Sequence, residues 1–259
     1  MKKRIVIFSP SPYSLYTTSV CELLLRNNIE ISCIVVKKFT LKRFIQEFRR
    51  DGKRLLKKIW NKLILKDRAY KNSQIKENII SFRDNEGIKT KSIFDFGIDV
   101  IQVDDLNNAT VEKCLSEINI DLIVFTGGGL IRENIFNVAG QGVLNCHMGV
   151  LPEYRGMDVP EWAILENNPH KVGFTVHFMD KGVDTGDILK VFTIMPQKDE
   201  TVKQLRERFE PLMVKGFVET IVDILDAKIV RKKQYLSEGK QYFIMHEKLL
   251  NKVNSKLKN

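Results

Sequence analysis

The chain has 259 residues, of which 43% are hydrophobic and 29% are charged. These proportions are typical of a globular protein, and the length suits one core with a modest appendage. No apolar run approaches the roughly 20 residues of a membrane helix, and prolines interrupt the amino-terminal MKKRIVIFSP before it could act as a signal peptide. The cysteines form no CxxC pair and no metal-like spacing with histidine. We therefore predict a cytoplasmic protein with free thiols and no metal site.

The net charge of +10 is concentrated in one segment. Residues 37–76 contain 15 Lys and Arg against three Asp and Glu, whereas the rest of the chain is close to neutral. Apolar residues recur there at helical spacing, which predicts a basic, amphipathic helical insert. Three interpretations remain open: a helix with solvated lysines, a site for an anionic acceptor, or contact with an anionic membrane at its inner face. No recognition motif supports nucleic acid as a partner.

Short apolar runs alternate with helical periodicity along the chain. Strands are expected at 4–9, 30–37, 99–103, 120–129, 143–147, 174–179 and 188–192. Helices are expected at 13–27, 75–85, 110–119 (capped by Thr110) and 158–167. Strands that alternate with helices indicate an α/β fold with βαβ units and a mainly parallel sheet.

Polar residues follow several of these strands. Asn145 and His147 are two residues apart at the end of VLNCH, so they point to the same face of the sheet. Asp180, Asp184 and Asp187 crowd the loop DKGVDTGD. On spacing alone, turn chemistry explains these aspartates. In open parallel sheets, however, ligands bind outside the carboxyl ends of the strands, which makes these loops candidates for a site.

The motifs NxH, LPxYRG and GxTVHxMDxGxDTGDI, in this order, resemble the formyltransferase family that uses 10-formyltetrahydrofolate. The family includes glycinamide ribonucleotide, methionyl-tRNA and sugar N-formyltransferases. The likeness is strongest from Gly142 to Leu189. It implies a Rossmann-like fold and a catalytic trio of Asn145, His147 and Asp184.

The residue types in this trio suit formyl transfer. When an amine attacks the formyl carbon, the carbonyl oxygen becomes an oxyanion, to which Asn145 and an imidazolium could donate hydrogen bonds. His147 could manage protons, and Asp184 would favour its charged form and help to deprotonate the amine. His177 is interpreted as structural. Resemblance places Gly127, Gly128, Gly129, Leu130, Asp180 and Val183 near the folate, and Tyr154, Arg155 and Gly156 near the acceptor.

Departures from the family bear on the acceptor. Gly149 stands where many relatives have the serine of HxSLLP, and SPSPYSLYT lacks the glycine-rich phosphate loop of glycinamide ribonucleotide enzymes. We therefore expect the acceptor to be a nucleotide-linked amino sugar, as in polysaccharide biosynthesis. Another small amine, an aminoacyl-tRNA, or a non-catalytic folate-binding role remain alternatives, and a homodimer stays open.

Two regions are expected along the chain. Residues 1–198 would form the catalytic core, with the basic insert at 37–76, and residues 199–259 a carboxy-terminal extension. Helical periodicity runs through Asp226, and the following IVRKKQYLSEGKQYFIMHE is expected to form a β-hairpin like the small tail of sugar formyltransferases.

Overall fold

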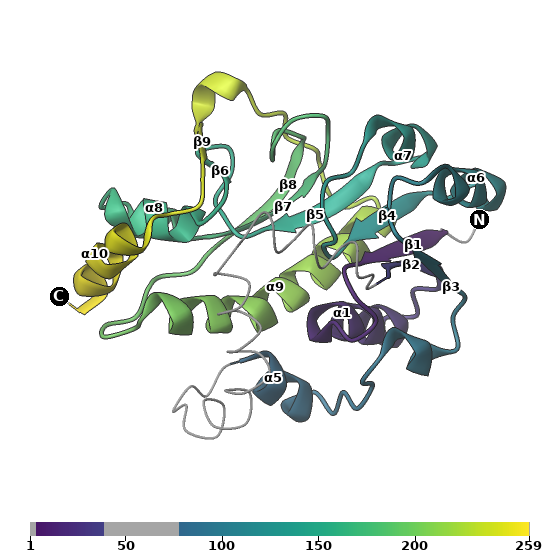
Figure 1. The fold of residues 1–259 in the computed structure, drawn as a ribbon, viewed down its shortest axis with the longest axis horizontal. Helices are drawn as coiled ribbons and strands as arrows, with labels where there is room; N and C mark the ends of the chain where they lie inside the picture. The colour runs from purple at the N-terminus through teal and green to yellow at the C-terminus, as the bar shows by residue number, and fades with distance from the viewer. Residues whose placement is uncertain (1–3, 39–77, 259) are drawn as a thin grey trace.

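A computed structural model describes residues 4–38 and 78–258, which form a central sheet between helices (Figure 1). The sheet has seven strands in the order β3-β2-β1-β4-β5-β7-β8. All pairs from β3 to β5 are parallel, and β7 and β8 are antiparallel additions. The strands are β1 (Ile5–Ser9), β2 (Ile31–Lys37), β3 (Val100–Val103), β4 (Leu122–Phe125), β5 (Val143–His147), β7 (Gly173–Phe178) and β8 (Ile188–Thr193). The predicted mainly parallel α/β fold is confirmed.

The helices follow the predicted alternation, with additions. They are α1 (Leu15–Arg26), α5 (Ile79–Asn85), α6 (Ala109–Ile118), α7 (Glu133–Val138), α8 (Val159–Leu165), α9 (Val202–Leu225) and α10 (Glu247–Lys258). Sequence periodicity did not predict α7 or α10. The prediction that Thr110 caps α6 was wrong. Asn108 is the capping residue, and its side-chain oxygen accepts a hydrogen bond from the Thr110 N–H at 2.8 Å. The predicted basic insert falls, apart from Lys37 and Lys38, outside the described residues.

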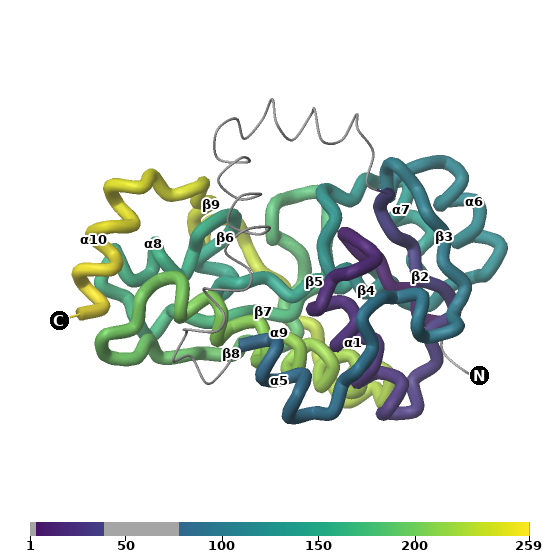
Figure 2. The backbone as a smooth tube through the Cα atoms, turned by 60° about the horizontal axis from the view of Figure 1, so that its bottom comes forward, coloured from purple at the N-terminus to yellow at the C-terminus, as the bar shows by residue number. Residues whose placement is uncertain are grey.

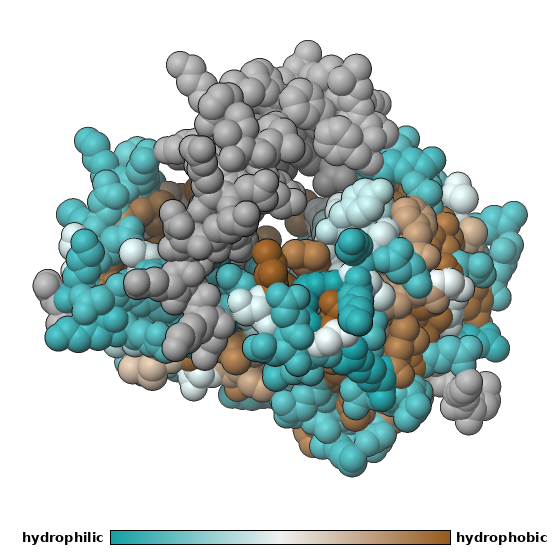
Figure 3. Space-filling view, turned by 90° about the horizontal axis from the view of Figure 1, so that it is seen from below, coloured by the Kyte–Doolittle hydropathy of each residue, from teal (hydrophilic) through white to brown (hydrophobic). Residues whose placement is uncertain are grey.

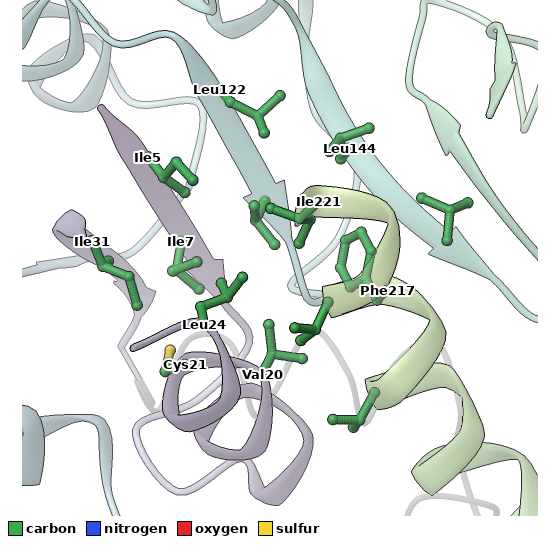
Figure 4. Packing of buried hydrophobic residues seen from close by; sticks show 14 of the residues in the cluster. Ile5, Ile7, Val20, Cys21, Leu24, Ile31, Leu122, Leu144, Phe217 and Ile221 are labelled. Atoms are coloured by element: carbon green, nitrogen blue, oxygen red, sulfur yellow. The ribbon is translucent and has the colours of Figure 1, made fainter. Parts of the chain in front are cut away.

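Both faces of the sheet are buried. Alternate residues of β1 point to opposite sides: Ile5 and Ile7 pack with α1 and α9, whereas Val6 and Phe8 pack with α6 and α7. Figure 4 shows the first of these clusters, where Phe217 and Ile221 of α9 lie against the strands. Figure 3 shows the molecule from below the view of Figure 1, where hydrophobic residues are visible among hydrophilic ones near the middle of this face.

The extension is continuous with this core. Helix α9 buries Phe217 and Ile221 in the same cluster as Ile5 of β1. Helices α8 and α10 pack together at one end of the molecule, away from β3 (Figure 2). The division predicted between residues 198 and 199 therefore falls inside one packed unit, and its use as a domain boundary stays a prediction.

The β-hairpin predicted for the tail was wrong. The tail strand β9 (Lys240–Tyr242) pairs in parallel with β6 (Tyr154–Gly156), more than 80 residues earlier in the chain. Lys232 forms a separate antiparallel bridge with Ile188. Contacts to the core favour this arrangement: Tyr242 stacks on Tyr154 at 5.2 Å between ring centroids. The strand pairings of Lys240–Tyr242 and of Lys232 are therefore made with the core and not within the tail.

Candidate active site

The predicted trio meets at the carboxyl end of β5. Asn145 and His147 lie on one face of this strand, and β7 runs antiparallel beside it with His177 opposite Asn145. Asp184 comes from the loop that joins β7 to β8, and its backbone is left-handed at φ 54°. Because β7 runs back beside β5, the loop after β7 places Asp184 next to His147, although the two residues are 37 positions apart in the sequence.

Asp184 is held between two histidines. Its Oδ2 lies 3.4 Å from Nδ1 of His147, and its Oδ1 lies 3.6 Å from Nε2 of His177. The backbone N–H of Gly156 donates to Oδ2 at 2.9 Å. Both histidines are buried, and the Asp184 side chain is 15% exposed. The three predicted residues thus form one cluster with a fourth member, His177.

His177 is the residue that sequence reasoning missed. It was interpreted as structural, yet its Nε2 lies 3.3 Å from Nδ2 of Asn145. Its Nδ1 lies 2.7 Å from the carbonyl oxygen of Phe178, which can only accept a hydrogen bond. We assign the proton of the neutral ring to Nδ1, which leaves Nε2 to accept from the Asn145 amide. A signal was present in the motif TVHFMD, where the histidine precedes the loop aspartate on a strand.

The His147 ring faces an acceptor on each side. Nε2 lies 3.0 Å from the carbonyl oxygen of Tyr154, and Nδ1 faces Asp184. A neutral imidazole donates to only one of them, whereas an imidazolium donates to both. Burial is the largest influence on His147 and lowers its pKa. The charge of Asp184 raises this pKa and His177 lowers it, and the resulting pKa is below the ordinary value for histidine. Asp184 thus favours the imidazolium as predicted, but burial outweighs it.

The carboxylate of Asp184 is stabilised in its charged form. Burial alone would raise the pKa of Asp184. With both histidines protonated, a hydrogen bond from His177 and the two positive charges, together with the Gly156 N–H, outweigh burial and hold the pKa of Asp184 below its ordinary value. At neutral pH the cluster therefore combines an ionised carboxylate with an imidazole that resists protonation.

Gly149 gives the His147 ring its space. A Cβ built at this position would lie 2.5 Å from Nε2 of His147, 2.8 Å from the Tyr154 oxygen and 2.4 Å from a methyl of Val159. These separations are shorter than any that packed atoms tolerate. The glycine that departs from the serine of many relatives is therefore required by the present orientation of His147.

Two loops flank the cluster. The run Gly127, Gly128 and Gly129 after β4 has φ between 118° and 125°, a backbone that favours glycine. Leu130 after it is 81% exposed, and Val183 in the loop that carries Asp184 is 41% exposed. Asp180 has a local partner set instead, since its Oδ1 accepts from the Gly182 N–H and the Thr185 hydroxyl at 2.9 and 2.5 Å. Folate contacts at these positions stay predictions.

The three residues predicted for the acceptor make internal contacts. The Tyr154 hydroxyl donates to Glu166, and the Arg155 guanidinium donates to the carbonyls of Leu236 and Gly239 at 3.0 and 2.9 Å. Both side chains are buried. Gly156 contributes its N–H to Asp184. These residues join the tail to the site, and their contact with an acceptor stays a prediction.

Within 4–38 and 78–258, no group of three or more His, Cys, Asp or Glu side chains is placed to hold a metal ion. In that part of the chain, no helix combines the length and the apolarity needed to span a bilayer.

A carboxylate between two buried histidines, beside an amide at the rim of an α/β sheet, forms a site for acid–base chemistry at a polarised carbonyl. The model of the formyl transferase family matches residues 64–221. The chain belongs to the formyl transferase family.

Known relatives agree with this assignment. The chain is 32% identical over 140 residues to a methionyl-tRNA formyltransferase of Caldanaerobacter subterraneus subsp. tengcongensis, a match over 53% of this chain and 45% of that protein. It is 35% identical over 126 residues to the methionyl-tRNA formyltransferase of Desulfotalea psychrophila, covering 48% and 39%. The matches therefore span half or less of these relatives' length.

Solved structures show the same fold. A sugar N-formyltransferase from Shewanella sp FDAARGOS_354 superposes with a TM-score of 0.60 at 14% identity, covering 99% of this chain and 88% of that one. Glycinamide ribonucleotide transformylase 1 from Symbiobacterium toebii gives 0.58 at 18% identity, covering 90% and 94%. At such identities these likenesses concern the fold alone.

Proposed function

We propose that this chain is an N-formyltransferase that moves a formyl group from 10-formyltetrahydrofolate to a primary amine. The observation that carries the proposal is the placement of Asp184 within 3.4 Å of His147 and 3.6 Å of His177, beside Asn145. Membership of the formyl transferase family supports it. The donor is a second substrate in this proposal, and no metal takes part.

Asn145 stabilises the charge that develops on oxygen. Attack by the amine nitrogen on the formyl carbon turns the carbonyl oxygen into an oxyanion. One amide hydrogen of Asn145 is directed at His177, which fixes the amide plane, and the other donates to the oxyanion. A fixed donor of this kind contributes about 3 kcal/mol to the transition state.

Asp184 and His147 move the proton. The attacking nitrogen must lose a proton when the new C–N bond forms, and the departing nitrogen of the donor must gain one when the old C–N bond breaks. Asp184 is ionised at neutral pH and accepts the first proton, directly or through a water molecule. Asp184 passes this proton to Nδ1 of His147, which lies 3.4 Å from its Oδ2, and His147 supplies a proton to the leaving nitrogen. The proton count therefore balances without an external acid.

The loops on either side suit a flat donor. Gly127, Gly128 and Gly129 let backbone approach a ring closely, and the exposed Leu130 and Val183 offer apolar contact. Asp180 shapes the second loop through its contacts with Gly182 and Thr185 and does not have to touch the donor. We propose these loops as the folate-binding elements.

The acceptor in this proposal is an amino sugar carried on a nucleotide. A protein named as a sugar N-formyltransferase shares the fold over nearly the full chain, which is compatible with such an acceptor. An aminoacyl-tRNA is the second candidate, favoured by the methionyl-tRNA formyltransferases among the relatives. A homodimer, cytoplasmic localisation and membrane contact through 37–76 stay predictions.

Release of tetrahydrofolate tests the proposal. The purified chain is incubated with 10-formyltetrahydrofolate and a panel of nucleotide-linked amino sugars, methionyl-tRNA and glycinamide ribonucleotide, with matched hydroxyl sugars as controls. Amine-dependent release with one sugar class supports the proposed acceptor, and release with methionyl-tRNA alone supports the second candidate. Folate binding without turnover on any amine would overturn the enzymatic proposal in favour of a binding protein.

A further inference from the structure

A side chain from the carboxy-terminal tail reaches the loop that carries Asp184. Nε2 of Gln234 donates to the backbone carbonyls of Asp184 and Gly186, at 3.0 and 2.5 Å. The two acceptors lie on either side of Thr185, so one amide group clamps this turn. A flipped amide would set Oε1 against two carbonyl oxygens, and the loop therefore demands the donor orientation.

The tail segment around Gln234 is itself fixed on the core. Lys232 and Ile188 exchange both backbone hydrogen bonds at 2.8 Å. The Arg231 guanidinium lies 3.8 Å from the centre of the Phe178 ring, and its Nη2 donates to the Gln141 carbonyl at 3.0 Å. These contacts join the tail segment to β7, to β8 and to the residue Gln141 before β5, so the backbone beside Gln234 is anchored on the sheet.

The clamped turn contains strained backbone. Asp184 is left-handed at φ 54°, a conformation that costs of order 1 kcal/mol or more outside glycine and persists only where neighbours enforce it. A Cβ at Gly186 would lie 2.1 Å from the Phe178 oxygen, so the turn is also closely packed. Rotation of the Asp184 peptide would swing its carboxylate away from His147.

We infer that Gln234 is a positioning residue for Asp184, which it holds in the orientation that faces both histidines. The inference rests on the proposed function, because it assigns the role of Asp184 from that proposal. Gln234 touches neither substrate in this account. It acts through the peptide groups on both sides of Thr185, and the tail thereby becomes part of the catalytic scaffold.

Two substitutions remove the clamp in different ways. Gln234→Glu keeps the size but replaces the donor by oxygen, and Gln234→Met keeps the length without any hydrogen bond. Gln241→Glu places the same charge on an exposed residue of the same tail and serves as the control. For each protein we would measure melting temperature, kcat and KM for both substrates, the pH–rate profile, and the imidazole titrations by NMR.

We expect kcat to fall by about tenfold or more in both Gln234 variants, with KM near that of the parent chain. When the loop shifts, the Asp184 carboxylate loses its contacts with the histidines and Gly156, which favour its charged form. The acid limb of the pH–rate profile should therefore move to higher pH. The titration of His147 should change as well. Gln241→Glu should behave like the parent chain in every measurement.

The outcomes separate this inference from the proposed function. Folded Gln234 variants with unchanged kcat, acid limb and His147 titration would overturn the inference. If the parent chain transfers no formyl group, the His147 titration still decides: a change supports the positioning role of Gln234, and no change overturns it. If neither Gln234 variant folds while Gln241→Glu does, Gln234 serves the fold instead, which also overturns the inference.

Discussion

His177 and Asn145 face each other across β5 and β7, with Nε2 of the histidine 3.3 Å from Nδ2 of the asparagine. The antiparallel register makes them Cα partners, so the contact is set by the pairing of two strands. The same ring nitrogen lies 3.6 Å from Asp184. One buried histidine thus fixes the amide of the proposed mechanism and lies beside its carboxylate.

The first prediction concerns this histidine. We expect His177→Ala to lower kcat by about tenfold or more, because Asn145 loses its orienting partner and Asp184 loses the ring that packs beside its carboxylate. KM for the donor should change less than kcat. His170→Ala, which removes an exposed histidine from the short 3-10 helix Pro169–Lys171, is the control. Parent-like kinetics in a folded His177→Ala protein would return His177 to the structural role.

The second prediction concerns the trio itself. Asn145→Ala or His147→Ala should reduce turnover by a factor on the order of a hundred or more, with the fold retained. Asp184→Asn should lower turnover far more than donor affinity, because it removes the proton acceptor and keeps the shape. Cys146→Ala, between the two strand residues but on the opposite face, is the control. Single-turnover kinetics and folate titration separate chemistry from binding.

Much of the fold was predictable because burial imposes local patterns. RIVIFS and EISCIVVK are buried on both faces of a parallel sheet, and short apolar runs bounded by turns report this directly. The pairing of β6 with β9 was not predictable: each has three residues, which is too short for a pattern, and the partners are distant in sequence. The cap at Asn108 was missed because a boundary shift of one or two residues changes the assignment.

The site was predictable in its composition and less so in its connections. Asn145, His147 and Asp184 stand at fixed positions of sequence motifs, so a family resemblance identifies them. The roles of His177 and Gln234 depend on strand register and on where the tail docks, and local sequence does not encode either. Gly149 was noted as a departure, but its reason required the position of the His147 ring.

The third prediction concerns stability at mildly acidic pH. The folded chain holds the pKa of His147 below 6.5, mainly through burial, so the unfolded chain binds this proton more readily. Stability from His147 is therefore fully present above about pH 6.5 and is lost as the pH falls through the folded pKa. We expect the melting temperature of the parent chain to fall more steeply below pH 6.5 than that of His147→Asn.

Asp184 acts in a separate window. Its folded pKa is below 3.8, so its contribution is present above that value and is lost at more acidic pH. Asp184→Asn should keep a slope between pH 6.5 and 5 at least as steep as that of the parent chain, because loss of the Asp184 charge lowers the pKa of His147 further. Parallel melting curves for the parent chain and His147→Asn across this range would contradict the assignment of a protonation-resistant His147.

The fourth prediction concerns Gly149. Substitution by alanine or serine places a Cβ within 2.5 Å of the His147 ring nitrogen, so the ring must turn away or the loop must shift. Overpacking of this kind costs about 1–3 kcal/mol, and the hydrogen bond from the ring to the Tyr154 carbonyl is lost with it. We therefore expect Gly149→Ala to lower both the melting temperature and kcat.

Serine at this position distinguishes two readings of the departure from the family. If Gly149 serves only the ring orientation, Gly149→Ser should lower the melting temperature as much as Gly149→Ala and change the Nε2 resonance of His147. If the loop accommodates serine by moving His147 into a productive position, kcat should rise while stability falls. A Gly149→Ser protein with parent-like stability, Nε2 resonance and kcat would show that the loop yields freely, and that the close contact between Gly149 and His147 does not restrain the site.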